Sequence, residues 1–339
     1  MAVVDLEDLG VRLGRWAADT FGPEWSIRDV EAMPGHAGLS FGFSLLDGDG
    51  EVRERLVTRM PPKGVRRRGN TDVLRQVPLL QALHRHGTPV ARVRYWSDDE
   101  RWFDVPFFMV ERLPGLTYNV RAPDPAFAGV TPATIFTQAV DALAGAHLLD
   151  VERELAGWEE PRLFLDEIAF WEPILAKAAE PEWVKMGERT RDLLLAHLPS
   201  DPKVGVFHGD FQTNNILFDD ARLVAVVDWE ISGVGAQLLD LGWLLMMNDP
   251  DSWADGAPLA AVPPFEMLVD RYSEGVGRAV TLDDVAFYRA LSGYRFGAIS
   301  GLNVMLHRTG KRPDIEWERI ALSVPALFGR AADLLEGAR

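Results

Sequence analysis

The sequence contains no cysteine in 339 residues, which excludes disulfide bonds, thiolate metal ligands and a cysteine nucleophile. It also lacks any uninterrupted apolar run of roughly 18 residues, the length expected of a membrane-spanning helix. Internal repeats and low-complexity segments are absent as well. The N-terminal residues MAVVDLEDLG do not show the basic and then apolar pattern of a signal peptide, so we expect a cytoplasmic protein.

Basic residues are scarce relative to acidic ones, 35 against 51, and the formal net charge is −16. Such a field repels nucleic-acid backbones and anionic membranes, so neither is expected as a partner. The charge favours a cationic or neutral small-molecule substrate. One basic run, KGVRRRG at 63–69, is interpreted as a solvated loop between a strand and a helix, with contact to a phosphate-bearing ligand as the alternative. The oligomeric state stays open.

The order of the predicted elements divides the chain into two lobes. Residues 1–112 are predicted to hold an amphipathic first helix, several strands with a hairpin at the turn DGDG (47–50), and an internal helix at 71–86. Helices dominate residues 113–339, after a stretch rich in proline and glycine. The expected architecture is therefore α+β, with a small, mainly β lobe followed by a larger, mainly α lobe. The helices expected in the second lobe are 132–149, 164–178, 182–198, 237–247, 263–276, 284–306 and 315–336.

The candidate site is the segment 206–230, VFHGDFQTNNILFDDARLVAVVDWE. Two apolar runs around DDAR predict a β-hairpin that brings Asn215 close to Asp228, with Asp210 in the loop that enters the hairpin. Buried carboxylates are costly unless they are paired or bound to a metal. Oxygen ligands of this kind suit Mg²⁺. The alternative is a purely structural network of buried polar groups.

The pattern H-G-D-x-x-x-x-N, followed by a strand and D-W-E, resembles the aminoglycoside phosphotransferase and choline kinase-like family, relatives of the protein kinases. The downstream segments SGVGAQLLDLGWLL and FYRALSGYRFGAISGL extend the resemblance over about residues 25 to 310. The chain is most similar to the branch of kinase-like domains fused to acyl-CoA dehydrogenases. The resemblance implies a bilobal protein-kinase-like fold. It also implies a phosphotransferase that uses ATP and Mg²⁺ to phosphorylate a hydroxyl of a small molecule, of aminoglycoside-like or hydroxyacyl type.

The resemblance gives each polar residue of this segment a role. Asp210 is expected to orient the acceptor hydroxyl and accept its proton. His208 belongs to the same catalytic loop and is expected to brace it by hydrogen bonding. Asn215 and Asp228 are expected to hold Mg²⁺, with Glu230 assisting the metal shell through water.

The first lobe is expected to bind the nucleotide. By resemblance, Gly38 and Ser40 belong to a loop that covers the phosphates. Arg59 stands where many relatives carry the strand lysine that contacts phosphates, and Gln76 is expected to pair with it in place of glutamate. The main chain from Glu111 to Leu113 is expected to face the adenine.

Several alternatives stay open at this stage. A pseudokinase that binds nucleotide without turnover is supported by Gln76, and an unrelated Mg²⁺-dependent hydrolase is a third possibility.

Asp240 is expected to accept backbone hydrogen bonds and hold the catalytic loop. The acidic run 248–256 could face a cationic acceptor or form a solvated loop. Two positions are considered for the tryptophans, packing in the core or lining a pocket: Trp158, Trp171, Trp183 and Trp243.

Overall fold

The computed structural model describes residues 5–33, 39–254, 256 and 261–337. The chain divides into two compact units, one of Met1–Gly115 with Val224–Ile231 and one of Leu116–Leu223 with Ser232–Arg339. The end of the candidate segment, which contains Asp228, therefore packs with the first unit. The functional labels predicted for 1–112 and 113–339 stay predictions.

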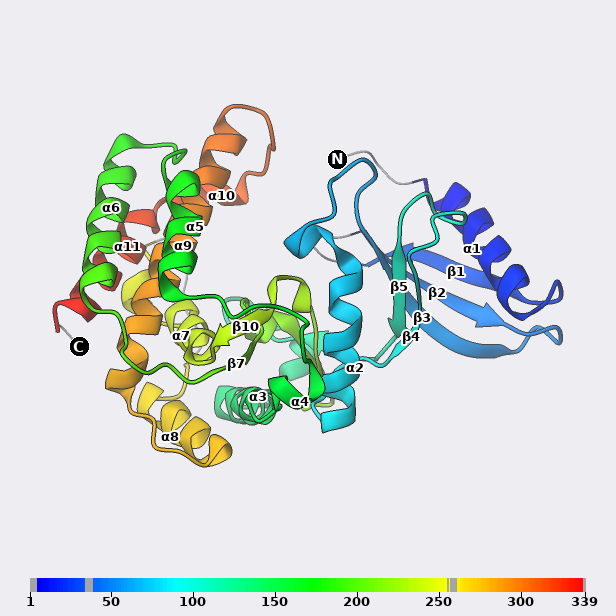
Figure 1. The fold of residues 1–339 in the computed structure, drawn as a ribbon, viewed down its shortest axis with the longest axis horizontal. Helices are drawn as coiled ribbons and strands as arrows, with labels where there is room; N and C mark the ends of the chain where they lie inside the picture. The colour runs from blue at the N-terminus through cyan, green and yellow to red at the C-terminus, as the bar shows by residue number, and fades with distance from the viewer. Residues whose placement is uncertain (1–4, 34–38, 255, 257–260, 338–339) are drawn as a thin grey trace. The chain divides into compact units, whose positions relative to one another are not determined.

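The first unit is built on a five-stranded antiparallel sheet in the order β1-β2-β3-β5-β4 (Figure 1). The hairpin predicted at 47–50 is confirmed between β2 and β3, where Asp47 Oδ1 accepts the N–H groups of Asp49 and Glu51 at 3.0 Å each. This side-chain acceptor fixes the turn because it replaces a backbone partner. The strands are β1 (Ser26–Ala32), β2 (Leu39–Leu46), β3 (Val52–Met60), β4 (Val93–Ser97) and β5 (Phe107–Glu111).

Helix α1 (Leu6–Phe21) packs its apolar face against this sheet. Asp5 caps its N-terminus, and the Asp5 side chain accepts the N–H groups of Glu7 and Asp8. Trp16 lies at the centre of the contact, with edge-on ring contacts to Phe43 and Tyr95 at 6.2 and 5.2 Å between centroids. The first core of the molecule is therefore aromatic and lies between α1 and the sheet.

Helix α2 (Gln76–His86) is shorter than the predicted helix 71–86, because two 3₁₀ turns precede it. Pro78 lies in the first turn of α2, where its missing N–H costs no helical hydrogen bond. The basic run 63–69 is exposed between β3 and these turns, as the solvated-loop interpretation expects.

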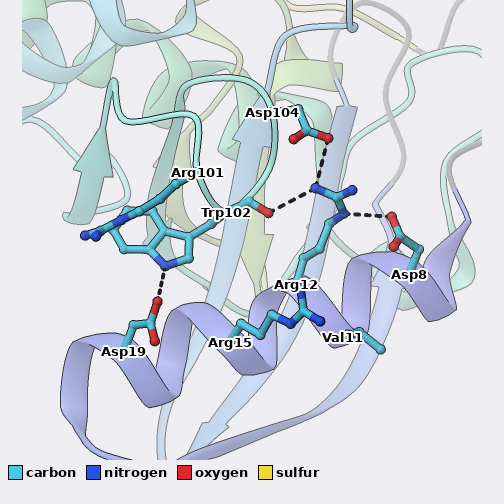
Figure 2. Close-up of a pocket in the computed structure, with 8 residues that line it drawn as sticks. All are labelled: Asp8, Val11, Arg12, Arg15, Asp19, Arg101, Trp102 and Asp104. Carbon is cyan, nitrogen blue, oxygen red and sulfur yellow. Dashed lines mark hydrogen bonds and ion pairs between the residues drawn. The ribbon is translucent and has the colours of Figure 1, made fainter.

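A hollow of about 380 Å³ lies between α1 and the loop 101–104 (Figure 2). Several of its polar side chains bond to one another. Arg12 forms ion pairs with Asp8 at 2.8 Å and Asp104 at 2.9 Å, and Trp102 Nε1 donates to Asp19 at 2.9 Å. These bonds tie the loop to the helix, so we assign the hollow a structural role.

The second unit is mainly helical, and its long helix α9 contacts α5, α6, α7 and α11. The predicted helix 315–336 is broken into α10 and α11. Pro325 occupies the first turn of α11, where a continuous helix would need its missing N–H. The helices are α3 (Pro132–His147), α4 (Val151–Glu154), α5 (Phe164–Leu175), α6 (Pro181–Ala196), α7 (Leu238–Met247), α8 (Phe265–Val276), α9 (Leu282–Arg308), α10 (Glu316–Ala321) and α11 (Val324–Leu335).

Short strands carry the candidate segment. The predicted hairpin is confirmed: Asp220 and Ala221 have φ of 46° and 61°, as a type I′ turn requires, between β8 and β9. β7 pairs with β10, a strand that the sequence did not predict. The strands are β6 (Leu116–Thr117), β7 (Val204–Phe207), β8 (Ile216–Asp219), β9 (Arg222–Val226) and β10 (Gly233–Ala236).

The acidic run 248–256 is tied into the helices where the structure describes it. Asp249 is 3% exposed and bonds the guanidinium groups of Arg289 and Arg330. Neither a solvated loop nor contact with a cationic acceptor describes this residue. Trp183 and Trp243 are core residues, 8% and 4% exposed. No helix in the described ranges is long and apolar enough to cross a membrane.

Candidate functional site

The segment 208–215 connects β7 to β8 within the second unit. Gly209 has φ of +88°, a conformation that favours glycine, so the chain can turn sharply between His208 and Asp210. His208 is fully buried, and its Nδ1 accepts the backbone N–H of Asp210 at 3.2 Å. A short 3₁₀ turn then brings Asn215 back toward Asp210.

The Asp210 carboxylate is held by two amide side chains. Gln212 Nε2 donates to Oδ1 at 2.7 Å, and Asn215 Nδ2 donates to Oδ2 at 2.9 Å. Because an ionised carboxylate only accepts, these bonds assign the nitrogen of Asn215 toward Asp210 and its Oδ1 away from it. The loop thus presents a fixed carboxylate, suited to accept a proton, beside an amide oxygen, suited to a hard cation.

Asp240 on α7 fixes the backbone of this loop. Its Oδ2 accepts the N–H of His208 at 2.6 Å and its Oδ1 accepts the N–H of Gly209 at 2.7 Å. Burial alone would raise the pKa of Asp240, but its interactions with His147 and His208 hold that pKa below its usual value. The expected bonds from Asp240 to the loop backbone are confirmed.

A chain of buried side chains continues behind Asp240 to α8. His147 Nε2 lies 3.2 Å from Asp240 Oδ2, and His147 Nδ1 lies 2.7 Å from the hydroxyl of Tyr272. Because a carboxylate accepts, Nε2 donates to Asp240, and Nδ1 shares a hydrogen bond with the hydroxyl. Burial raises the pKa of Tyr272, so this hydroxyl keeps its proton. The loop 208–215 is thus held through α3, α7 and α8.

In the first unit, Arg59 on β3 lies between two carboxylates. Its Nη2 donates to Asp228 Oδ1 and to Glu230 Oε2, each at 3.0 Å. Arg75 Nη1 donates to the main-chain oxygen of Glu230 at 2.8 Å. The side chains of Arg59 and Asp228 are 18% and 33% exposed, so this cluster is accessible to a ligand at Asp228.

The expected pairing of Arg59 with Gln76 is wrong. Gln76 is 2% exposed at the start of α2, and within the described ranges Arg59 makes its hydrogen bonds to the two carboxylates. The reason is that the segment 224–231 packs in the first unit. A charged acceptor binds a guanidinium more strongly than a neutral amide does.

The oxygen donors of the cluster fit Mg²⁺. Asp228 Oδ2 has no hydrogen bond to the part of the chain that the structure describes. The two carboxylates of Asp228 and Glu230 and the guanidinium of Arg59 together carry a formal charge of −1. Among the residues that could be searched, no group of three His, Cys, Asp or Glu side chains could hold a metal ion alone. Mg²⁺ commonly takes one or two carboxylates and completes its shell with water and phosphate.

Two other residues, Gly38 and Ser40, were predicted to contact the phosphates together with Arg59, and the structure places one of them beside Arg59. Ser40 on β2 is directly paired with Arg59 in the antiparallel ladder, so the two side chains stand on the same face of the sheet. Gly38 lies outside the described residues.

The end of β5 offers one main-chain donor to a ligand. The N–H of Glu111 is used by the carbonyl oxygen of Arg92 at 3.0 Å. The N–H of Leu113 has no hydrogen-bond partner within the described ranges. Contact of either residue with adenine stays a prediction.

Comparison with the profile of the Phosphotransferase enzyme family matches residues 33–273 of the chain. The chain belongs to this family. Mouse acyl-CoA dehydrogenase family member 10 is 26% identical over 260 residues, which are 72% of this chain and 24% of that protein. The chain thus spans about a quarter of the length of this curated relative, and the branch named from the sequence is confirmed.

Solved structures of phosphotransferases share the fold. A putative aminoglycoside phosphotransferase from Ralstonia eutropha has a TM-score of 0.74 at 21% identity, over 97% of this chain and 98% of that one. Amicoumacin kinase in complex with AMP-PNP, Ca²⁺ and Ami has a TM-score of 0.62 at 12% identity, over 97% and 96% of the two chains. The predicted bilobal, protein-kinase-like α+β fold is confirmed.

Several residues of the site were missed by the sequence analysis. Gln212 stands inside the quoted fragment, and its spacing of two residues from Asp210 could have suggested the contact. His147, Tyr272 and Arg295 come from distant helices, so no local pattern connects them with the loop.

Proposed function

We propose that the chain transfers the γ-phosphoryl group of ATP to a hydroxyl of a small molecule. The observation that carries this proposal is the geometry of the loop 208–215. One carboxylate, Asp210, is fixed by Asn215 and Gln212 in a family whose members are phosphotransferases. Phosphoryl transfer needs positioning and charge neutralisation more than covalent chemistry, and a rigid loop supplies positioning.

Each residue of the loop has a role in this reaction. Asp210 orients the acceptor hydroxyl and accepts its proton as the γ-phosphate is attacked. Its two oxygens accept from Gln212 and Asn215, and these bonds hold the carboxylate in one position as the proton acceptor. His208 braces the loop through the N–H of Asp210.

The nucleotide is assigned mainly to the first unit. Arg59, with Ser40 beside it, contacts the phosphates, and the N–H of Leu113 serves the base. Asn215 and Asp228 would hold Mg²⁺, with Glu230 assisting through water, and a bound ion would supply neutralisation of charge on the transferred phosphoryl group.

The acceptor is proposed in two classes that an experiment can separate. The name of the curated relative, an acyl-CoA dehydrogenase family member, supports a hydroxyacyl acceptor. The name of the structural neighbour, a putative aminoglycoside phosphotransferase, supports an aminoglycoside-like acceptor. Incubation of the chain with Mg²⁺-ATP and a panel of hydroxyacyl thioesters, aminoglycosides and simple alcohols would decide between them. ADP and the phosphorylated product are measured by mass spectrometry, and absence of both with every acceptor would contradict the proposal.

A second candidate function is a pseudokinase that binds nucleotide without turnover. It is favoured by one observation, the bonds that Arg59 makes to both Asp228 and Glu230 where oxygen atoms are needed for a metal. Calorimetric titration measures ATP binding, and the acceptor panel measures ADP release. A pseudokinase binds ATP but releases no ADP with any acceptor, whereas the enzyme binds Mg²⁺-ATP and releases ADP.

A further inference from the structure

Arg295 on α9 contacts the backbone of the loop 208–215 at the same residue as Asp240. Its Nη2 donates to the carbonyl oxygen of Gly209 at 3.2 Å, while Asp240 accepts the N–H of the same residue at 2.7 Å. Both polar groups of Gly209 are therefore bonded to buried charged side chains. The carbonyl of Gly209 belongs to the peptide bond that leads into Asp210.

The burial of Arg295 is costly, and packing does not explain it. The residue is 3% exposed, and its buried Nε and Nη1 atoms make no hydrogen bond within the described ranges, although Nε lies within ion-pair distance of Glu167. The faces of Trp171 and Trp243 lie 5.3 and 5.0 Å from the guanidinium carbon, so cation–π attraction offsets part of the cost. A hydrophobic residue of similar volume would often be as stable or more stable in such a place. An apolar residue could make neither the bond to Gly209 nor the ion pair with Glu167.

Glu167 on α5 orients the guanidinium. Its Oε1 lies 3.3 Å from Arg295 Nε, and the same oxygen accepts the indole N–H of Trp171 at 3.0 Å. The carboxylate is thus fixed by a neighbour one helical turn away. Through this pair, α5 and α9 both define where the donor of Arg295 points.

We infer that Arg295, aimed by Glu167, is a positioning residue that sets the orientation of Asp210 through the peptide bond between Gly209 and Asp210. Gly209 has φ of +88° and no side chain to limit its rotation. The N–H of this peptide, from Asp210, is bonded to His208 Nδ1 at 3.2 Å. With the carbonyl free, the peptide could tilt about that bond, and the backbone that carries the Asp210 side chain would move with it. The kinetic part of the inference rests on the proposed function, and the structural part does not.

The structural part has a spectroscopic test that needs no acceptor. The sequence contains two Gly-Asp steps, Gly48-Asp49 and Gly209-Asp210. Protein labelled with ¹³C-carbonyl glycine and ¹⁵N-aspartate therefore gives two correlated amide signals, and the turn at Gly48 is an internal reference. In Arg295→Met, we expect the carbonyl resonance of Gly209 to move upfield, as on loss of a donor, while that of Gly48 stays. An unchanged Gly209 resonance in the folded variant would overturn the inference.

Arg289→Met is the matched control for the kinetic test. Arg289 lies on the same helix, is 4% exposed and covers the ring of Phe265, but it bonds Asp249 and not the loop. With Mg²⁺-ATP and an accepted hydroxyl compound, or water as the acceptor before one is found, Arg295→Met should lower kcat about tenfold to a hundredfold, the effect of losing a charged hydrogen bond. The KM for ATP should stay within about twofold. A loss no greater than that of Arg289→Met would overturn the inference.

Two milder variants keep the test decisive where Arg295→Met does not fold. Arg295→Lys retains the charge and one donor, so it should recover part of kcat and part of the Gly209 shift. Glu167→Gln retains an acceptor for Trp171 but removes the ion pair, so its loss should be smaller than that of Arg295→Met. If the parent chain turns over no ATP, the proposed function fails. The Gly209 resonance then still decides whether Arg295 holds the loop.

Discussion

Replacement of Arg59 by methionine tests the assignment of the first unit most sharply. The guanidinium is the shared donor of Asp228 and Glu230, with both contacts at 3.0 Å. Methionine keeps an apolar stem but removes the donor and its charge. The summed formal charge of these three side chains then changes from −1 to −2, and the predicted phosphate contact is lost.

The expected size of the effect follows from that loss. A hydrogen bond to a charged group contributes about 1.5 to 3 kcal/mol. Each 1.4 kcal/mol is about a tenfold change in a dissociation constant. Arg59→Met should therefore raise the Kd for Mg²⁺-ATP about tenfold to a hundredfold, and the added repulsion of the phosphates acts in the same direction.

The assay is calorimetric titration with Mg²⁺-ATP, beside two controls. Arg55→Met makes the same replacement four residues earlier on β3, at an exposed arginine, and should leave the Kd unchanged. Gln76→Ala removes a buried amide that does not bond Arg59, and it should change the Kd by less than about twofold. Arg59→Met binding Mg²⁺-ATP as the parent does would refute the phosphate assignment.

Two further predictions concern the carboxylates. Asp228→Ala should weaken ATP binding in the presence of Mg²⁺ and abolish its dependence on the metal, because it removes a charged ligand of the ion. Equal affinity with and without Mg²⁺ in the parent would contradict the metal assignment. The pKa of Asp240 is below its usual value in the folded chain. Its ionised form therefore stabilises the fold at pH above about 3.9, the pKa of the unfolded chain, and this contribution is lost as the pH falls through the pKa of the folded chain. Below about pH 4, the free energy of unfolding measured in urea should therefore fall more steeply with decreasing pH in the parent than in Asp240→Asn. Equal slopes in the two proteins would contradict the stabilising role of ionised Asp240.

The parts of the site that the sequence predicted are those set by local spacing. Asp210 and Asn215 both belong to the segment predicted as the site, and the structure shows them bonded across a separation of five residues. The hairpin that leads to Asp228 is indicated by two apolar runs around a turn, and Asp220 and Ala221 adopt the turn conformation. In these cases the residues that define the geometry lie within the pattern itself.

The parts that the sequence did not predict depend on distant contacts. Arg59 and Asp228 are 169 residues apart, and the sequence pattern suggested Gln76 as the partner because the packing of 224–231 with the first unit was not visible. The bond from Arg295 to Gly209 spans 86 residues. Strand β10, GVGA, escaped prediction because two glycines and two small or branched residues give no alternating pattern.

The central claim is that the Asp210 carboxylate promotes transfer of the γ-phosphoryl group to a hydroxyl. The most direct measurement follows label from [γ-³²P]ATP into an accepted compound with the parent chain and with Asp210→Asn. This variant keeps the size of the side chain and removes its ability to take a proton. The account predicts that the parent labels the acceptor, and that Asp210→Asn labels it at least about a hundredfold more slowly while binding Mg²⁺-ATP normally. Labelling by Asp210→Asn at the rate of the parent would contradict the account.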